Sequence, residues 1–265
     1  MSTIQHLTRT VCALLLGAAS WAAQSQAPAP AAPAAPAAAN APAARQWAAP
    51  NEGVTNGVRA LERGHYAIAM RSWRAEADKG HPMAQANIGY LYEHGLGVGQ
   101  SYVEAMAWYR KAAAQNLPQA QFNIGTLYFY GYGVELNKRE ALGWFRQAAR
   151  QDLADAQYML GLALHEGHGT PPDSRAGLEW FHKAALQGHV GGQLMSALIY
   201  LGGDHGKPEP YKAHVWADLA HTNGSNDASL VRDYASYKLD RKEIAQAREQ
   251  AQACLKTGYR NCLAR

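Results

Sequence analysis

The residues most suggestive of chemistry are three alternating glycines, Gly95, Gly97 and Gly99, in the segment "YEHGLGVGQ". Backbone N–H groups of a glycine-rich loop at a helix N-terminus bind phosphate, so a nucleotide site is one interpretation. Related segments, "YFYGYGVEL" and "LHEGHGTPP", follow at steps of 36 residues. A phosphate loop occurs once and follows a strand, whereas no strand pattern precedes these segments. We therefore interpret the glycines as helix ends, where glycine adopts a left-handed conformation without strain.

Histidines are the second chemical candidates, because the chain contains 11 of them. The segment "HEGH", from His165 to His168, resembles a zinc-binding helix. The zinc-protease motif places its histidines four residues apart on one helix, but here they are three apart and Gly167 begins a loop. We predict no metal site and no cofactor, and a histidine-based metal or pH sensor remains an alternative. His214 falls on an apolar stripe and is expected to be a hydrogen-bonded core histidine.

Catalytic and nucleic-acid-binding motifs are not evident. The sequence has no G-x-S-x-G elbow and no C-x-x-C pair, so we predict that the chain is not an enzyme. Its 25 basic and 21 acidic residues nearly balance, and no basic run occurs. The electrostatic attraction on which nucleic-acid binding relies is therefore missing.

The first 50 residues have the composition of an export signal followed by a tether. Residues 1–22 combine Arg9, a short apolar run and small residues, as a secretory signal peptide does. Cleavage is best placed after Ala22, with Ala23 a near competitor. The apolar run is shorter than the ~20 residues of a membrane span, so no span is expected after cleavage. Residues 23–50 are rich in Ala and Pro and are expected to form an extended tether or a disordered free end. This pattern predicts a periplasmic or secreted protein of a Gram-negative bacterium.

Removal of the signal leaves two cysteines, Cys254 and Cys262. In an oxidising compartment, such a pair is expected to form a disulfide that joins the C-terminal tail to the last helix. The alternative is one buried thiol and one free thiol, since pairing also depends on geometry.

A 36-residue repeat organises the rest of the chain. Three segments align without gaps from Pro82, Pro118 and Ala154, and a looser copy begins at Val190. Several residue types recur in register: Trp108, Trp144, Trp180 and Trp216, as well as Gln85, Gln121, Gln157 and Gln193. Periodic self-similarity of this length indicates a stacked repeat architecture.

Each copy reads as a pair of helices. The second half of the first copy has apolar residues at Ala105, Trp108, Tyr109 and Ala112, which is the spacing of one helix face. Ser101 and Glu104 precede it as a capping box, as Asn137 and Glu140 do in the next copy, and Asp173 supplies a cap in the third. Gly80, Asn116, Asp152, Gly188 and Gly224 follow the second helices, and these residue types tolerate the left-handed conformation that ends a helix. The repeated tryptophans are expected to be core residues.

The predicted fold is therefore all-α, an α-solenoid of stacked antiparallel helical hairpins. Its expected parts are listed along the chain: an N-terminal capping hairpin at 51–81, repeats at 82–117, 118–153 and 154–189, a divergent repeat at 190–225, a C-terminal capping hairpin at 226–258, and a tail at 259–265. Atypical terminal units are expected, because they cover the exposed core of their neighbours.

The run "AQANIGYLYEHGLGVGQSYVEAMAWYRKAAAQN" resembles the Sel-one-like repeat, a relative of the tetratricopeptide repeat. The resemblance covers roughly residues 52–256 and implies a right-handed superhelix that mediates protein-protein interactions, in many members within the bacterial envelope. The fourth copy departs from the pattern, with Ala197 in place of a glycine, His205 in place of a loop glycine and Ala217 in place of an aromatic residue. Some cysteine-rich relatives have been linked to penicillin binding, so a cell-wall enzyme or penicillin-binding protein is a further alternative. This chain has no cysteine pair within its repeats.

By analogy with tetratricopeptide arrays, the first helix of each repeat is expected to line a concave groove that binds a protein or peptide partner. The candidate contact residues are Asn87, Tyr90, His94, Phe122, Asn123, Thr126, Tyr130, Tyr158 and Leu162, with Glu93 beside them. Asn87 and Asn123 occupy the place where relatives hold a peptide backbone, although an asparagine there also serves to bond a neighbouring loop. The sequence leaves both interpretations open.

Overall fold

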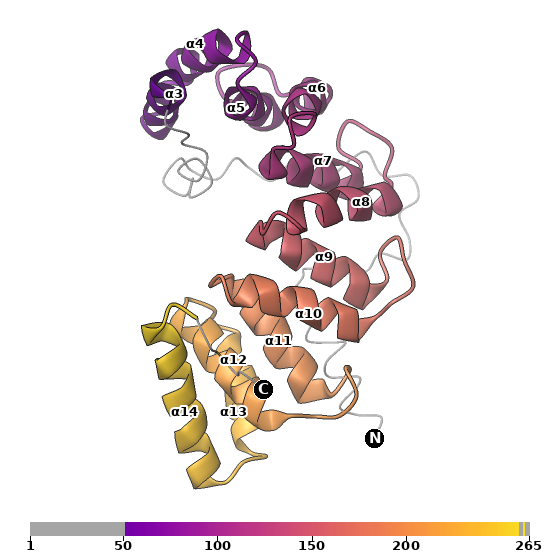
Figure 1. The fold of residues 1–265 in the computed structure, drawn as a ribbon, viewed down its shortest axis with the longest axis vertical. Coiled ribbons are helices and arrows are strands. Elements are labelled where there is room, and N and C mark those ends of the chain that lie inside the picture. Colours follow the sequence, from indigo (N-terminus) through magenta and orange to yellow (C-terminus); the bar gives the residue numbers. More distant parts are fainter. Residues whose placement is uncertain (1–50, 260–261, 263–265) are drawn as a thin grey trace. The chain divides into compact units, whose positions relative to one another are not determined.

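The computed structural model describes residues 51–259 and Cys262. The expected signal peptide, the Ala/Pro segment and most of the tail after Tyr259 lie outside the described residues. Every regular element within the described part is an α-helix, as predicted (Figure 1). The helices are α3 (Glu52–Glu62), α4 (Tyr66–Ala77), α5 (Pro82–His94), α6 (Tyr102–Ala113), α7 (Pro118–Tyr130), α8 (Lys138–Ala149), α9 (Ala154–Glu166), α10 (Ser174–Ala185), α11 (Val190–Gly202), α12 (Pro210–Thr222), α13 (Ala228–Ser236) and α14 (Arg241–Lys256).

The chain divides into two compact units between Ala156 and Gln157. In the unit that ends at Ala156, hairpin partners pack together as α3 with α4, α5 with α6 and α7 with α8. Contacts of α4 with α5 and of α6 with α7 stack successive hairpins. In the unit that begins at Gln157, α10 packs on α11, α11 on α12, and α12 on both α13 and α14. The fold is an all-α repeat solenoid.

The helix ends follow the local rules expected from the sequence. Gly95 and Gly131 end α5 and α7 with φ angles of 65° and 73°, in the left-handed region. Asn116 and Asp152 take the same conformation, with φ of 62° and 60°. The loop glycines therefore end helices, and the phosphate interpretation finds no support in their conformation.

Most expected N-caps are present, but the capping boxes are incomplete within the repeats. Ser101 and Asn137 each accept a hydrogen bond from the backbone N–H three residues later, at 3.2 and 3.0 Å. Asp173 does the same for α10 at 2.9 Å. Both halves of a capping box are present at Asp240 and Glu243, at the start of α14.

A glycine of the first helix lies directly beneath an aromatic ring of the second helix in each regular hairpin. A Cβ at Gly89 would lie 2.6 Å from the Tyr109 ring, and one at Gly125 would lie 2.7 Å from the Phe145 ring. The third copy repeats this contact at Gly161 and Phe181, with 2.8 Å. Since real Cβ atoms do not approach so closely, glycine at this position is what allows the two helices to pack around the ring.

The fully buried aromatics correct the expectation that the repeated tryptophans are all core residues. Trp108 and Trp216 are buried, but Trp144 and Trp180 keep part of their surface exposed. Trp144 donates from its indole to Glu140 at 3.0 Å. The ring next along the chain occupies the core, because it projects from the helix face that meets the glycine.

Buried amides join the beginning and the end of each hairpin. In each pair, a residue that follows the second helix donates to the buried glutamine of the same repeat position: Gln115 to Gln85 (3.0 Å), Gln151 to Gln121 (2.8 Å), Gln187 to Gln157 (2.8 Å) and Asn223 to Gln193 (2.8 Å). A buried amide without a partner costs about 1–3 kcal/mol, so these pairs favour one register of the two helices within each hairpin.

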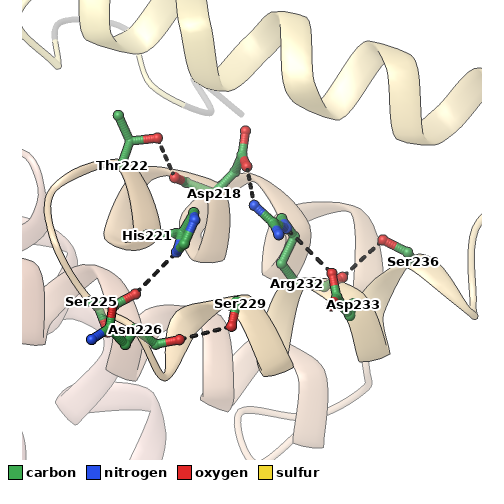
Figure 2. A network of polar contacts seen from close by, with 9 residues as sticks. All are labelled: Asp218, His221, Thr222, Ser225, Asn226, Ser229, Arg232, Asp233 and Ser236. Carbon is green, nitrogen blue, oxygen red and sulfur yellow. Dashed lines mark hydrogen bonds and ion pairs between the residues drawn. The ribbon is translucent and has the colours of Figure 1, made fainter.

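Polar contacts join α12 and α13 (Figure 2). Arg232 of α13 forms an ion pair with Asp218 of α12 at 3.3 Å, which joins the cap to the fourth copy. The last helix carries buried Ala247, Ala251 and Cys254. Cys254 forms a disulfide with Cys262, so the tail is bonded to α14.

We expect the glycine–aromatic contact to be energetically coupled. Gly125→Ala should destabilise the protein by about 1–3 kcal/mol through overpacking, and Phe145→Ala by about 3–5 kcal/mol through the cavity it leaves. The double variant should lose less than the sum, because the new methyl group occupies space that the ring vacates. Denaturant unfolding of the four proteins measures this coupling.

Gly143→Ala is the matched control, because a Cβ at Gly143 meets no atom within 4 Å. Its helix interior should gain about 0.5–1 kcal/mol. If the losses of unfolding free energy in Gly125→Ala and Phe145→Ala simply add in the double variant, the predicted coupling is wrong.

Candidate functional site

The candidate partner surface in residues 51–156 is the α5–α7 face, defined by partly exposed side chains of these two helices: Tyr90, Glu93, His94, Phe122, Asn123, Thr126 and Tyr130. Tyr130 is the most accessible, with 51% of its surface exposed. The Tyr90 and His94 rings lie 4.1 Å apart, and a ring nitrogen of His94 lies 3.1 Å from the Tyr90 carbonyl oxygen. Because one helical turn separates these two residues, their side chains share one face of α5.

The buried hydroxyl of Tyr109 lies between α5 and α7, the first helices of two successive repeats. It donates to Glu93 Oε2 of α5 at 2.5 Å, and the Asn123 side chain of α7 lies close enough to lower its pKa. Burial raises the pKa of Tyr109 well above its usual value, and the neighbouring Glu93 raises it further. Asn123 thus lies beside this phenol, while part of its surface remains exposed.

Two of the candidate residues are buried. Asn87 has no exposed surface, and neither atom of its amide has a hydrogen-bond partner among the described residues. Leu162 is 8% exposed and packs in the core of the second unit. Neither side chain is accessible to a partner in this conformation.

Three tyrosines form a stacked surface feature that sequence reasoning missed in part. Tyr102 stacks on Tyr132 with ring centroids 4.9 Å apart, and Tyr132 stacks on Tyr130 at 5.5 Å. We call these three residues the tyrosine strip. It forms because Gly133, at φ 66°, brings the loop against the start of α6, where a Cβ would lie 2.6 Å from the Cβ of Tyr102. In the sequence, the position of Tyr132 between two repeated loop glycines could have indicated this feature.

The remaining candidate side chains of α7 bond or pack locally. Thr126 donates to the Phe122 carbonyl oxygen at 3.1 Å, which satisfies its hydroxyl within the helix. The Phe122 ring lies 5.8 Å from Phe145. Both side chains therefore offer contact area on the α5–α7 face, and neither is placed mainly to hydrogen-bond a partner.

In the second unit, Tyr158 is half-buried between two rings. Its ring lies 5.7 Å from Phe181 and stacks on His189 at 4.8 Å. His165 lies 3.0 Å from the Ser174 hydroxyl, and burial lowers its pKa. These rings extend the packing around the hairpin core.

The histidines of "HEGH" have separate partners, so they do not converge. His165 faces Ser174, whereas His168 pairs with Glu166 at 3.3 Å. No group of three or more His, Cys, Asp or Glu side chains in the described residues is placed to hold a metal ion.

His214 was expected to be a hydrogen-bonded core residue, and only part of that expectation is correct. Its side chain is fully buried, but neither ring nitrogen has a hydrogen-bond partner among the described residues. Burial lowers its pKa, so the neutral form is favoured in the folded protein.

A partly buried histidine replaces an arginine of the earlier repeats. Arg74 stacks over Trp108 at 4.9 Å, and His182 occupies the equivalent position beside Trp216 at 5.3 Å. Tyr200 lies 5.4 Å from the His182 ring. Burial, with smaller contributions from Lys212 and His205, lowers the pKa of His182 to about 4.

This pKa predicts acid sensitivity of the second unit. The folded pKa of His182 lies below its unfolded value of 6.5, so the unfolded chain binds more protons between pH 6.5 and about 4. Stability should therefore fall by up to about 3 kcal/mol as the pH drops through this window. His182→Phe keeps an aromatic ring and removes the titration, so its unfolding free energy should depend less steeply on pH. Leu230→Ala, at an exposed position that does not titrate, is the control and should leave the slope unchanged.

Comparison with known proteins identifies the repeat. The Sel1 repeat model matches residues 82–117, 118–153 and 154–189. No curated protein sequence matches the chain significantly.

Two solved structures are similar to this chain over most of its length. The Sel1 repeat protein from Oxalobacter formigenes is 32% identical, with a TM-score of 0.63, and the alignment covers 73% of this chain and 84% of that one. A protective antigen of uropathogenic Escherichia coli strains, which displays an SLR fold, is 30% identical, with a TM-score of 0.70 over 79% of this chain. This chain spans 47% of the length of the Escherichia coli protein. With its repeated helical hairpins and this likeness, the chain belongs to the Sel1 repeat family.

Proposed function

We propose that this chain is a non-catalytic scaffold of the bacterial cell envelope that binds an extended protein segment along the α5–α7 face. Sel1 repeat proteins generally act as protein-protein interaction scaffolds. The similar Escherichia coli structure is described as a protective antigen.

The observation that carries the proposal is the tyrosine strip at the edge of the α5–α7 face. Tyr130 leaves half of its surface exposed while stacking fixes its ring against Tyr132. Ordered tyrosines supply large contact areas with few rotamers left to freeze on binding, and they are enriched at the energetic centres of interfaces. An extended segment that crosses α5 and α7 would meet Tyr90 and Tyr130 in succession.

Export is supported by the sequence of residues 1–22, which has the features of a secretory signal. Within residues 51–259, no helix combines the length and hydropathy that a transmembrane span requires. The Ala/Pro composition of residues 23–50 suits a spacer between the repeats and a neighbouring surface.

Site-specific crosslinking tests the binding surface. A photoreactive phenylalanine analogue in place of Tyr130 should yield a defined adduct in the producing cells, whereas the same analogue at the exposed Ala107 of α6 should not. Tyr90→Ala should reduce the Tyr130 adduct about tenfold, because it removes part of the contact area. Equal adducts at both positions, or an adduct insensitive to Tyr90→Ala, would contradict the proposed surface. Circular dichroism of the variants establishes that each is folded.

Fractionation tests the location. Expressed in a Gram-negative host, the full chain should appear in the osmotic-shock fraction with the mass expected after loss of residues 1–22. A variant that starts at Ala23 should stay in the cytoplasm. Recovery of the unprocessed full chain from the cytoplasm would refute export.

A further inference from the structure

The end of α5 differs chemically from the equivalent place in the other copies. The residue four positions after the hairpin glycine lies against the aromatic ring of the second helix. In the second copy this pair is Phe129 and Phe145, with ring centroids 6.0 Å apart, and in the third it is His165 and Phe181, at 6.4 Å. In the first copy the pair is a carboxylate, Glu93, and a buried phenol.

That carboxylate is desolvated and lacks a cation. Burial raises the pKa of Glu93, and the hydrogen bond from Tyr109 lowers it only in part. No Lys or Arg in residues 51–259 forms an ion pair with Glu93, and the positive group that acts on its pKa is the neighbouring His94. The hydrogen bond from Tyr109 occupies Oε2, while Oε1 accepts no hydrogen bond from the described residues.

Two tyrosines lie near this carboxylate. Tyr90 precedes Glu93 by three residues on the same face of α5. Gln100 donates both to the Glu93 carbonyl oxygen, at 2.8 Å, and to the Tyr102 hydroxyl, at 3.3 Å. After burial, Glu93 is the strongest influence that raises the pKa of Tyr90, and it also raises the pKa of Tyr102. Glu93, Tyr90 and Tyr102 each keep part of their surface exposed. Tyr102 also belongs to the tyrosine strip, so the carboxylate adjoins the surface proposed to bind a segment.

A negative charge in low dielectric near tyrosine rings is an environment that attracts a cation. A desolvated carboxylate without a counter-ion is unfavourable, and an incoming cation would relieve that cost. Tyrosine faces add cation–π attraction when the cation is partly desolvated. An acidic side chain or a C-terminal carboxylate would be repelled at the same place.

We propose that Glu93, with the rings of Tyr90 and Tyr102, receives a lysine or arginine side chain of the bound segment. This inference rests on the proposed scaffold function and specifies its partner: a segment with a cationic residue that reaches the end of α5. Tyr109 is a positioning residue, because it donates to Oε2 and leaves Oε1 without a hydrogen bond from the described residues.

Selection from a random peptide display library on the mature chain tests the inference. Peptides recovered on the unmodified protein should be enriched in Lys or Arg at one position, and Glu93→Gln should abolish this enrichment. For a selected peptide, Glu93→Gln should weaken binding about tenfold, as expected for loss of one partner of a desolvated charge pair. The glutamine keeps an oxygen that accepts the Tyr109 hydrogen bond, so the fold should be retained. Glu135→Gln, an exposed loop residue, is the matched control and should leave binding unchanged.

The outcomes separate the two proposals. Peptides that bind without a cationic preference, or whose preference survives Glu93→Gln, would overturn the cation site and leave the scaffold function standing. Peptides whose binding is indifferent both to Glu93→Gln and to Tyr90→Ala with Tyr130→Ala would overturn both. If no peptide is recovered above the level of a selection without the protein, the cation site and the scaffold function are both overturned. Replacing the selected Lys or Arg by norleucine should reduce binding to the unmodified protein but leave binding to the Glu93→Gln variant unchanged.

Discussion

The close packing of one glycine beneath one aromatic ring is the contact on which each regular hairpin depends. A side chain at Gly89, Gly125 or Gly161 would lie within 3 Å of the ring opposite, so the two helices approach as they do only because that Cβ is missing. The fourth copy makes the same hairpin differently. Both partners there are alanines, Ala197 and Ala217, and both are fully buried. On α11 the methyl group of Ala197 replaces the glycine, and on α12 Ala217 replaces the aromatic residue. The added methyl group offsets part of the lost ring volume between the two helices.

A second constraint acts within each hairpin and, in two copies, also between neighbouring hairpins. The glutamine that begins each first helix is buried and receives an amide hydrogen bond from the residue that follows the second helix of the same repeat. In two copies it also donates to the carbonyl at the end of the preceding hairpin, as Gln85 does to Ala77 and Gln193 to Ala185. Since an unpaired buried amide is costly, a shift of one hairpin against the next would break several bonds together.

The repeats differ in chemistry at positions where a copy departs from the shared pattern of packing and hydrogen bonds, which we call the frame. The frame provides a fixed place against the ring of the second helix, and the first copy puts Glu93 there with a phenol beneath it. It likewise provides a stacking place on the next tryptophan, which Arg74 fills near the N-terminus and His182 fills near the C-terminus. Departures of this kind change charge without disturbing the backbone, so binding chemistry varies while the repeat stays constant.

The sequence by itself determined the helix pairs, their caps and their left-handed ends, because these depend on local residue types at a regular 36-residue spacing. It also contained the series that make the buried amide pairs, although the spacing did not show that they bond. Only the tertiary structure decided which ring of "WY" or "WF" enters the core, because that depends on which ring meets the glycine of the other helix. The tertiary structure also decided the candidate site. It buries Asn87, stacks Tyr102 on Tyr132, and places Glu93 against Tyr109. Each outcome depends on contacts between different helices, which the sequence pattern alone does not show.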